Sequence, residues 1–374
     1  MKTTTLILTI TLTASLACCA FAKSAPEKER PIDLVICLDT SNSMDGLINA
    51  AKQKLWDIVN ELATAKPKPH LRVALYAYGT PGFGAETGYV RKQIDLTDDL
   101  DAVYGKLTAL VTNGGDEYVA RVVRTSVMEQ PWSAEKDALK IIVVAGNEPA
   151  TQDRQFTTAD VCKDAITRGI IVNAIYCGPA TSREADGWRD VARAADGQFA
   201  SIDQDRGTIV VSTPFDQRLA VLGGEINRTY LAYGVRGAEG RAMQTAADTS
   251  AAAASPAVFA SRAVAKASGQ YRNASWDLVD AMTRKDFDLA KVNEGELPAE
   301  MRAMTHDQRK AHLDAMAKKR AGVQQEINQL NAQRQKFIDE EMKKGGKSAD
   351  KAFDAAMLRA IREQAVRKSF AFEK

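Results

Sequence analysis

Three oxygen-bearing side chains stand at alternating positions early in the chain, in the segment Asp39-Thr40-Ser41-Asn42-Ser43. One carboxylate and two hydroxyls on the same side of a tight turn offer the oxygen ligands that hard divalent cations prefer. Asp and Ser are also common helix-capping residues, so a helix start without a bound ion is the alternative interpretation. The spacing predicts a divalent-cation site formed by Asp39, Ser41 and Ser43.

The flanking sequence places this segment between a strand and a helix. Residues 33–38 form an almost continuous apolar run, which is typical of a strand covered on both faces. Beyond Ser43, apolar residues recur at helical spacing as far as Leu62. In open α/β sheets, ligands bind beyond the carboxyl ends of strands where the strand order reverses, and this turn follows the first strand.

Apolar strand candidates alternate with amphipathic helices as far as residue 202. Strands are predicted at 71–78, 89–96, 139–144, 170–176 and 198–202, and helices at 100–111, 117–128, 158–168 and 184–195. This order predicts an α/β fold with a doubly wound, mostly parallel sheet. A helix over 214–231 is expected to close this domain.

The rest of the chain is predicted to be an α-helical C-terminal region. Residues 238–267 include 13 alanines and predict an alanine-rich linker or weak helix within 233–270. Residues 271–374 predict a helical hairpin or coiled region, in which Thr305 and Gln308 form a capping box. Its seam is Leu313, Met316, Val323, Ile327, Leu330 and Phe337, with Arg320 and Arg334 at two seam positions. Cations at seam positions favour an intramolecular hairpin over a strong isolated coiled coil.

The first 22 residues have the pattern of a secretory signal. Lys2, an apolar run over 6–16 and a small-x-small site at Ala20-Phe21-Ala22 predict a signal peptide over residues 1–22. We therefore expect an exported protein, periplasmic or secreted. We expect no transmembrane helix, because no apolar run reaches the length of a membrane span. Cys18 and Cys19 leave a lipid-anchored lipoprotein as the alternative.

The charge of the chain nearly cancels, with 50 basic and 48 acidic residues. Residues 23–260 carry 26 basic and 31 acidic side chains, whereas residues 261–374 carry 23 and 17. A nearly neutral chain lacks the basic signature of a nucleic-acid-binding protein. The chain has three histidines and no evident general base, which argues against a metal hydrolase, so we expect no enzymatic activity.

The Asp-x-Ser-x-Ser motif at this place in the fold resembles the metal-ion-dependent adhesion site (MIDAS) of von Willebrand factor A (VWA) domains. The resemblance covers residues 31–205 and implies a VWA domain that extends to residue 232 with its closing helix. It also implies a divalent cation, usually Mg²⁺ with Ca²⁺ or Mn²⁺ as alternatives, held by Asp39, Ser41 and Ser43 directly or through water. The C-terminal region loosely resembles the tails of bacterial exported proteins that carry this domain.

Two other positions of the family motif are altered. The family supplies a threonine after a pair of glycines, but Gly114-Gly115 is followed here by Asp116. The resemblance thus implies Asp116 as an acidic fourth ligand, with Thr112 as a poorer candidate. An aspartate usual at the end of the fourth strand is replaced by Ala145, and Asn147 or Glu148 could substitute for it if the loop bends inward.

Cys37, Cys162 and Cys177 remain after the predicted cleavage. Cys162 lies near the start of a predicted helix and Cys177 at the end of the strand that follows it, so both are expected toward the carboxyl edge of the sheet. Exported proteins favour disulfides, and the sequence predicts a Cys162–Cys177 disulfide. Cys37, inside the first strand, is expected to be a buried thiol.

Together these features predict an exported, non-enzymatic VWA-domain protein that binds a protein partner at the carboxyl edge of its sheet. The cation is expected to organise the loops and to accept an acidic side chain of the partner as a further ligand. The alternative is a structural scaffold of the cell envelope that uses its helical C-terminal region for contacts and no metal.

Overall fold

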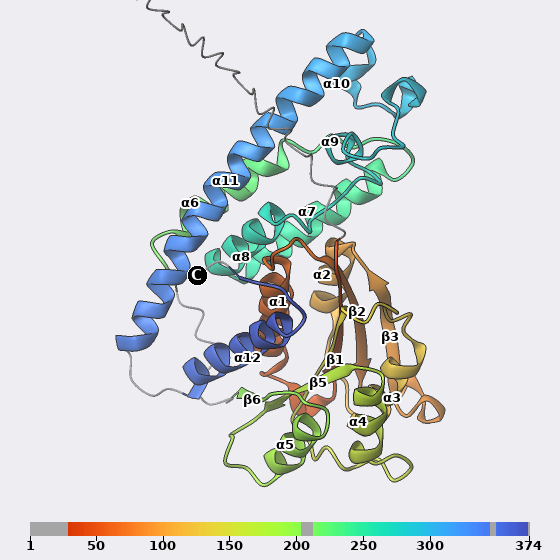
Figure 1. Cartoon of the computed structure of the whole chain (residues 1–374), viewed down its shortest axis with the longest axis vertical. Coiled ribbons are helices and arrows are strands. Elements are labelled where there is room, and N and C mark those ends of the chain that lie inside the picture. Colours follow the sequence, from red (N-terminus) through yellow and green to blue (C-terminus); the bar gives the residue numbers. More distant parts are fainter. Residues whose placement is uncertain (1–28, 203–211, 345–348, 373–374) are drawn as a thin grey trace, which may run out of the picture.

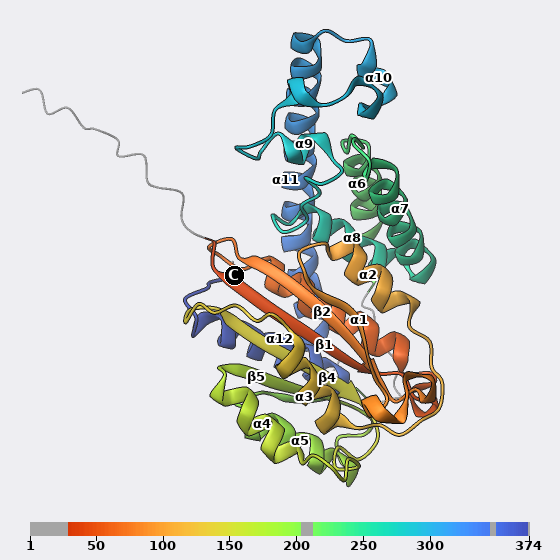
Figure 2. The same ribbon diagram turned by 90° about the vertical axis from the view of Figure 1, so that its right-hand side faces the viewer.

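The computed structural model describes residues 29–202, 212–344 and 349–372. Within these residues, six strands form one sheet in the order β3-β2-β1-β4-β5-β6. All neighbouring strands are parallel except β2 and β3, so the predicted doubly wound, mostly parallel sheet is confirmed (Figures 1 and 2). The strands are β1 (Pro31–Asp39), β2 (His70–Tyr78), β3 (Val90–Thr97), β4 (Leu139–Gly146), β5 (Ile170–Cys177) and β6 (Phe199–Ile202).

Helices cover both faces of this sheet and create two hydrophobic cores. Alternate residues of β1 explain the division, because Ile36 and Leu38 belong to one core and Val35 and Cys37 to the other. The first core lies under α1 (Ile48–Ala63) and α2 (Leu100–Ala109). The second lies under α3 (Val119–Glu129), α4 (Thr158–Thr167) and α5 (Glu184–Ala194). The continuous apolar run in β1 is therefore a strand buried on both faces.

The helix that completes the first core comes from the far end of the chain. In α12 (Ala349–Val366), Met357, Ile361 and Ala365 are buried in the same core as β1. This helix packs beside α1 and against β6 (Figure 1). The sheet domain is thus built from two separated segments, residues 31–202 and the C-terminal helix.

The structure differs from the predicted boundary at residue 232. The predicted closing helix exists as α6 (Asp216–Asn227), but it packs on α8 (Pro256–Ala267) and α11 (His306–Lys344). Its apolar residues Leu219, Leu222 and Ile226 form a third core with alanines of α8 and with Ile327 of α11. Because any amphipathic helix can cover either a sheet or other helices, its sequence alone did not reveal which partner it has.

A helical module therefore stands between β6 and α12. The alanine-rich segment forms two helices, α7 (Gly237–Ala254) and α8, in place of a linker, since alanine has the highest intrinsic helix propensity. Two short helices, α9 (Leu278–Ala281) and α10 (Ala299–Arg302), precede α11. In place of the predicted hairpin, α11 packs on α6, α8 and α9, while α12 packs on the sheet domain.

A buried group of charges connects the helical module to the sheet domain. Arg262 of α8 forms an ion pair with Asp101 of α2 and another with Asp248 of α7, where Nε and Oδ1 are 2.7 Å apart. Lys266 donates to the second oxygen of Asp248 at 2.6 Å. Tyr271 also donates to Asp101. Since all of these groups are buried, their pairing offsets the cost of removing the charges from water.

The predicted signal peptide and the cysteines at positions 18 and 19 lie outside the described residues. Among the described segments, no helix is both long enough and apolar enough to cross a membrane.

Candidate functional site

The aspartate–serine motif lies where β1 ends and a tight turn leads into α1. Asp39 is the last residue of β1, and its Oδ1 accepts a hydrogen bond of 2.8 Å from the backbone N–H of Ser41. A single 3-10 turn (Asn42–Met44) then brings the hydroxyls of Ser41 and Ser43 together, with 2.8 Å between the two Oγ atoms. The turn places the carboxylate and both hydroxyls together, as the spacing predicts.

Asn147 joins this group from the neighbouring strand. It follows β4, and its Oδ1 accepts a hydrogen bond of 2.9 Å from the Ser43 hydroxyl. Its Nδ2 donates to the backbone carbonyl of Ser43 at 2.8 Å. The aspartate that is usual in the family is replaced here by Ala145, whose backbone carbonyl accepts a hydrogen bond from the Tyr78 hydroxyl. Asn147 therefore supplies the side-chain oxygen on this side of the site.

Glu117, and not Asp116, is the acid that faces the motif. Asp116 is exposed, and its Oδ2 accepts a hydrogen bond of 3.3 Å from the Tyr118 hydroxyl. Glu117 is buried, with 8% of its surface exposed, and its carboxylate accepts a hydrogen bond from Ser41. The acid after the glycine pair was predicted one position too early, because the conformation of the loop decides which of two adjacent acids turns inward.

Gly79, at the end of β2, shows how closely these groups converge. A Cβ at this position would lie 2.7 Å from Oδ1 of Asp39 and 3.1 Å from Cγ of Glu117. It would also lie 3.3 Å from Cβ of Ser41. Gly79 has φ +85°, which disfavours other residues as well. The absence of a side chain here leaves room for the two carboxylates and the serine.

The other two candidate residues lie at the edge of the site. The Thr112 hydroxyl donates to Asp45, on the turn after Ser43, and not to the carboxylate of Asp39. The backbone carbonyl of Glu148 accepts a hydrogen bond of 2.8 Å from Trp188. The Glu148 carboxylate lies near enough to raise the pKa of both Asp39 and Glu117.

The electrostatics of the site favour a positive ion. Burial raises the pKa of Asp39 from 3.8 to about 7, and the charges of Glu117 and Glu148 add to this effect. Burial also raises the pKa of Glu117. Oδ2 of Asp39 is buried and has no hydrogen-bond partner, which is costly for a carboxylate oxygen. A cation beside Asp39 would supply the missing partner and would restore the charged form of the acid.

The donors present fit a hard divalent cation. Among the described residues, no three side chains from His, Cys, Asp and Glu converge closely enough to hold a metal ion by themselves. A cation at Asp39 would therefore need hydroxyl and amide oxygens in addition to carboxylates, and Ser41, Ser43 and Asn147 supply them. An all-oxygen set suits Mg²⁺, Ca²⁺ and Mn²⁺ better than ions that prefer nitrogen or sulfur.

The predicted Cys162–Cys177 disulfide is wrong, because both thiols and that of Cys37 are free and buried. Cys162 packs in the core beneath α3, α4 and α5, where its thiol contacts the carbonyl of Val191 at 3.5 Å. Cys177 points into the core on the other face of the sheet. The prediction considered only the edge of the sheet on which the two residues lie, whereas the alternation of strand side chains determines the face.

Sequence comparison places the sheet domain in a known family. The family model described as von Willebrand factor type A domain matches residues 33–208. Residues 33–208 are a VWA domain. VWA domains commonly act as protein-interaction modules, and many bind a divalent metal at a MIDAS. None of the curated proteins matches this chain.

Solved structures that resemble the VWA domain have low sequence identity. BatB from Bacteroides thetaiotaomicron is 15% identical, with a TM-score of 0.36, and the match covers 46% of this chain and 90% of that chain. The SpRpn10 VWA domain is 16% identical, with a TM-score of 0.38, and the match covers 46% of this chain and 89% of that chain. Proximal thread matrix protein 1 from the mussel byssus, solved with a zinc-occupied MIDAS motif, is 12% identical, with a TM-score of 0.36. That match covers 48% of this chain and 43% of the mussel protein.

Proposed function

We propose that this chain is an exported protein that binds a protein partner through a divalent cation at the carboxyl edge of its VWA sheet. The cation is Mg²⁺, or Ca²⁺ or Mn²⁺ in its place, and Asp39, Ser41 and Ser43 hold it. Glu117 takes the part that the sequence predicted for Asp116. The observation that carries the proposal is the buried carboxylate of Asp39, which has one unpaired oxygen and lies beside the Ser41 hydroxyl and the Glu117 carboxylate.

Each residue has a distinct part in this mechanism. Asp39 and Glu117 supply negative charge, and the buried position of both makes their attraction to a cation stronger than it would be in water. Asn147 fixes Ser43 through two hydrogen bonds, so the serine hydroxyl is held in position before an ion arrives. The cation, when bound, supplies a positive charge and a coordination position that an acidic side chain of the partner can fill.

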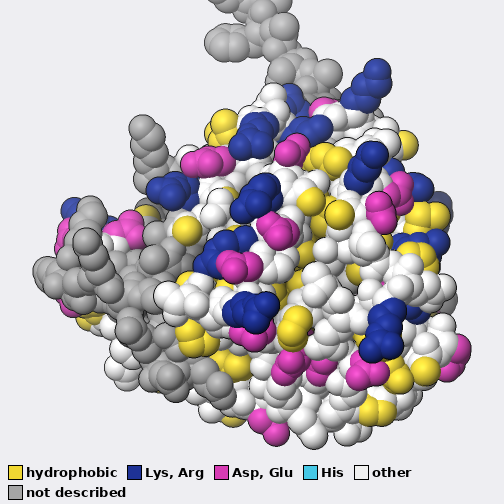
Figure 3. Space-filling model, turned by 90° about the horizontal axis from the view of Figure 1, so that it is seen from below, with side chains coloured by type: hydrophobic (Ala, Val, Ile, Leu, Met, Phe, Trp, Pro, Cys, Tyr) yellow, Lys and Arg dark blue, Asp and Glu magenta, His cyan; other side chains and the backbone are white. Residues whose placement is uncertain are grey.

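The surface of the sheet domain carries charges of both signs. Figure 3 views the molecule from below, the side on which the sheet domain lies in Figure 1. Lys and Arg side chains are interspersed there with Asp and Glu, and apolar side chains lie between them. Val111, on the loop before Glu117, is 75% exposed and offers an apolar contact near the site.

Capture of partners by the full chain tests this function. The immobilised protein is incubated with envelope extract of its host, with Mg²⁺ or with a chelator, and captured proteins are identified. We expect a partner that is lost with the chelator and with Asp39→Ala, but retained with Asp116→Asn. The last variant changes an exposed acid beside the site and is the matched control.

The scaffold alternative predicts a different outcome of the same experiment. It has support in α11, a helix of 39 residues on which Lys318 and Lys319 are exposed. The scaffold function would be established if capture of the partner is unchanged by the chelator and by Asp39→Ala, but is lost when both lysines are changed to glutamate. Deletion of residues 271–374 is unsuitable, because it would remove the α12 residues that complete the VWA core.

A further inference from the structure

The amino ends of the strands form the edge of the sheet that lies opposite the candidate metal site. β1, β2 and β4 run parallel and begin at this edge, and the segment after α12 lies beside the start of β1 (Figure 2). Arg30 donates to the carbonyl of Ser369 at 3.0 Å, and the backbones of Lys66 and Ala371 exchange hydrogen bonds of 2.6 and 2.7 Å. Segments that are far apart in the sequence therefore converge at this edge.

Basic side chains gather here and form what we call the amino-edge patch. The Lys140 ammonium donates to the carbonyl of Arg168 at 2.6 Å, and the Lys368 ammonium donates to the carbonyl of Lys136 at 2.9 Å. Burial lowers the pKa of Lys140, and the nearby charge of Lys368 adds to this effect. The patch consists of Arg30, Lys66, Lys136, Lys140, Arg168 and Lys368.

Only two members of the patch have an acidic partner among the described residues. Arg30 lies 4.0 Å from Asp137, and Arg168 lies 3.1 Å from Asp164. The other four members form no ion pair with a described residue. Two of these four donate to backbone carbonyls, which orient an ammonium group but leave its charge uncompensated. The patch therefore carries an excess of positive charge.

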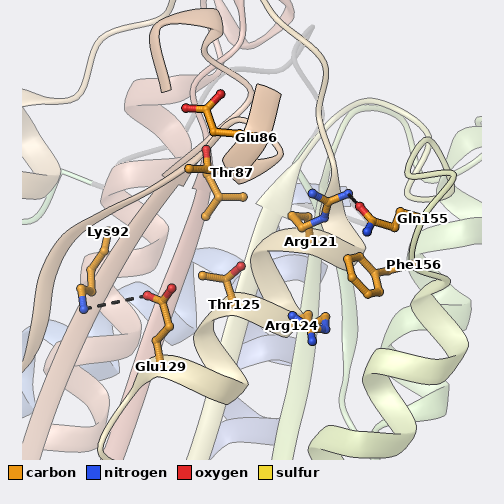
Figure 4. A pocket seen from close by; sticks show the side chains of 10 residues that line it. Glu86, Thr87, Lys92, Arg121, Arg124, Thr125, Glu129, Gln155 and Phe156 are labelled. Atoms are coloured by element: carbon orange, nitrogen blue, oxygen red, sulfur yellow. Dashed lines mark hydrogen bonds and ion pairs between the residues drawn. The ribbon is translucent and has the colours of Figure 1, made fainter. Parts of the chain in front are cut away.

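The other acids nearby do not cancel this excess. Glu29 pairs with Arg272 of the helical module, and Glu129 lies 3.9 Å from Lys92 at a cavity of about 370 Å³ beside β3 (Figure 4). Glu135, in the loop before β4, offsets one charge of the patch at most. The edge as a whole is therefore positive, and a surface of this kind attracts anions from solution.

Two exposed apolar side chains border the patch. Sδ of Met128 lies 3.4 Å from Nη2 of Arg168, and 50% of Met128 is exposed. Val366 is 56% exposed and stands two residues before Lys368. Basic residues combined with exposed apolar ones are typical of proteins that lie on a membrane, where the charges meet headgroups and the apolar groups enter the boundary with the acyl chains.

We propose that the amino-edge patch binds a membrane surface rich in anionic phospholipids. The inference rests on the export in the proposed function, which brings the chain to a membrane, and not on the cation. The headgroup phosphates pair with the lysines that have no acidic partner, while Met128 and Val366 enter the boundary below the headgroups. The chain enters β1 at this same edge, so a lipid anchor at Cys18 or Cys19 would attach the protein from the same side.

This orientation leaves the candidate metal site accessible. Pro31 begins β1 and Asp39 ends it, and the nine residues of this strand span roughly 26–30 Å. A membrane at the amino edge therefore lies on the far side of the sheet domain from the carboxyl edge. A protein partner can approach the metal site from the aqueous side.

Vesicle co-sedimentation with the full chain tests this surface. The vesicles contain phosphatidylcholine alone or with about 30% phosphatidylglycerol, and a chelator is present throughout so that no divalent cation bridges protein and lipid. We expect the chain to bind the anionic vesicles at least about tenfold more tightly than the neutral ones. Binding should be lost at about 1 M NaCl, where the screening length is about 3 Å.

Charge reversal locates the contact. Lys66→Glu combined with Lys136→Glu should weaken binding to the anionic vesicles by at least about tenfold, because both exposed lysines belong to the patch. Lys318→Glu combined with Lys319→Glu makes the same change in net charge on exposed residues of α11, and this variant should bind like the wild type. Circular dichroism verifies that both variants fold.

The proposal is overturned by equal binding to neutral and anionic vesicles, by no binding to either, or by equal loss of binding in the two double variants. Tighter binding to a short DNA duplex than to the anionic vesicles would also overturn it, because the patch would then be a site for nucleic acid. Lack of vesicle binding alongside chelator-sensitive capture of a partner would reject this surface and leave the proposed function intact.

Discussion

Asp39 combines a buried position with an unpaired carboxylate oxygen, and this makes the metal-free protein sensitive to pH. The pKa of its side chain is about 7 in the folded protein, compared with 3.8 for an aspartate that is free in water. Between these values the folded state holds the proton more tightly than the unfolded state. The contribution of Asp39 to stability is therefore fully present below about pH 4 and is lost as the pH rises to about 7.

Asp39→Asn should accordingly stabilise the metal-free protein above pH 7. Asparagine keeps the acceptor for the Ser41 N–H but carries no buried charge at any pH. In chelator, we expect the melting temperature of the variant to exceed that of the wild type at pH 8, with a difference that shrinks toward pH 4. With excess Mg²⁺ the order should reverse, because only the wild type gains stability from binding. A variant that melts lower than wild type at pH 8 in chelator would contradict this account of Asp39.

Two adjacent acids provide a second test at this scale. Glu117→Gln should weaken Mn²⁺ binding by at least about tenfold, because it removes a carboxylate charge from beside Asp39. Asp116→Asn should change the affinity by less than about twofold, since its side chain is exposed and turned toward Tyr118. The affinities are measured by electron paramagnetic resonance of free Mn²⁺. A larger effect at Asp116 than at Glu117 would restore the prediction made from the sequence.

The sequence sufficed for those site residues whose positions follow from local geometry. Asp39, Ser41 and Ser43 are close in sequence, so a strand end and one turn bring them together. The sequence could not show that Glu117, and not Asp116, turns toward Asp39. That depends on the conformation of the loop at 112–116, in which the backbone N–H of Asn113 donates to the carbonyl of Thr40.

At the scale of elements, the sequence of α11 predicted which of its residues are buried but not which residues they contact. Its predicted seam was correct, because Leu313, Val323 and Ile327 are buried. The two arginines in that seam are buried as well, and they pair with acids of other helices. Arg320 lies 2.8 Å from Asp277 and 2.7 Å from Asp280, and Arg334 lies 2.8 Å from Asp216. The sequence showed the cations but not the acids that would meet them.

Arg320→Ala should destabilise the protein strongly. It would leave the buried carboxylate of Asp277 without its cation, and loss of one partner from a buried ion pair costs about 3–5 kcal/mol. Arg359→Ala, which removes an exposed contact of 3.9 Å to Glu363, should cost less than about 1 kcal/mol. Urea denaturation measures both. Equal free energies of unfolding for the two variants would show that Arg320 does not hold α11 to α9.

At the scale of the whole molecule, the VWA domain and the helical module depend on each other. The chain leaves the sheet after β6, builds the module and returns as α12 to complete the first core. Residues 23–260 carry a net negative charge and residues 261–374 a net positive charge. Two ion pairs connect these segments, one between Arg262 and Asp101 and one between Arg362 and Glu61. The periodic pattern of α12 was predicted, but no local signal could show that its partner is a strand more than a hundred residues earlier.

Ile361→Ala tests whether α12 belongs to the VWA core. Ile361 is fully buried against the sheet domain, and removal of such a side chain costs about 2–5 kcal/mol. Val366→Ala, on the same helix but 56% exposed, should have little effect. Hydrogen exchange by mass spectrometry should show faster exchange in β1 and β6 for the first variant alone. Unchanged exchange in those strands would mean that α12 does not support the sheet.

The cation at Asp39 is the central claim, and calorimetric titration of Mg²⁺ and Mn²⁺ into the metal-free full chain tests it most directly. The account predicts one site per chain in the wild type and in Asp116→Asn. It predicts no measurable binding in Asp39→Asn, whose fold is verified by its melting curve. A wild-type chain that binds neither ion, or an Asp39→Asn variant that binds as tightly as the wild type, would contradict it.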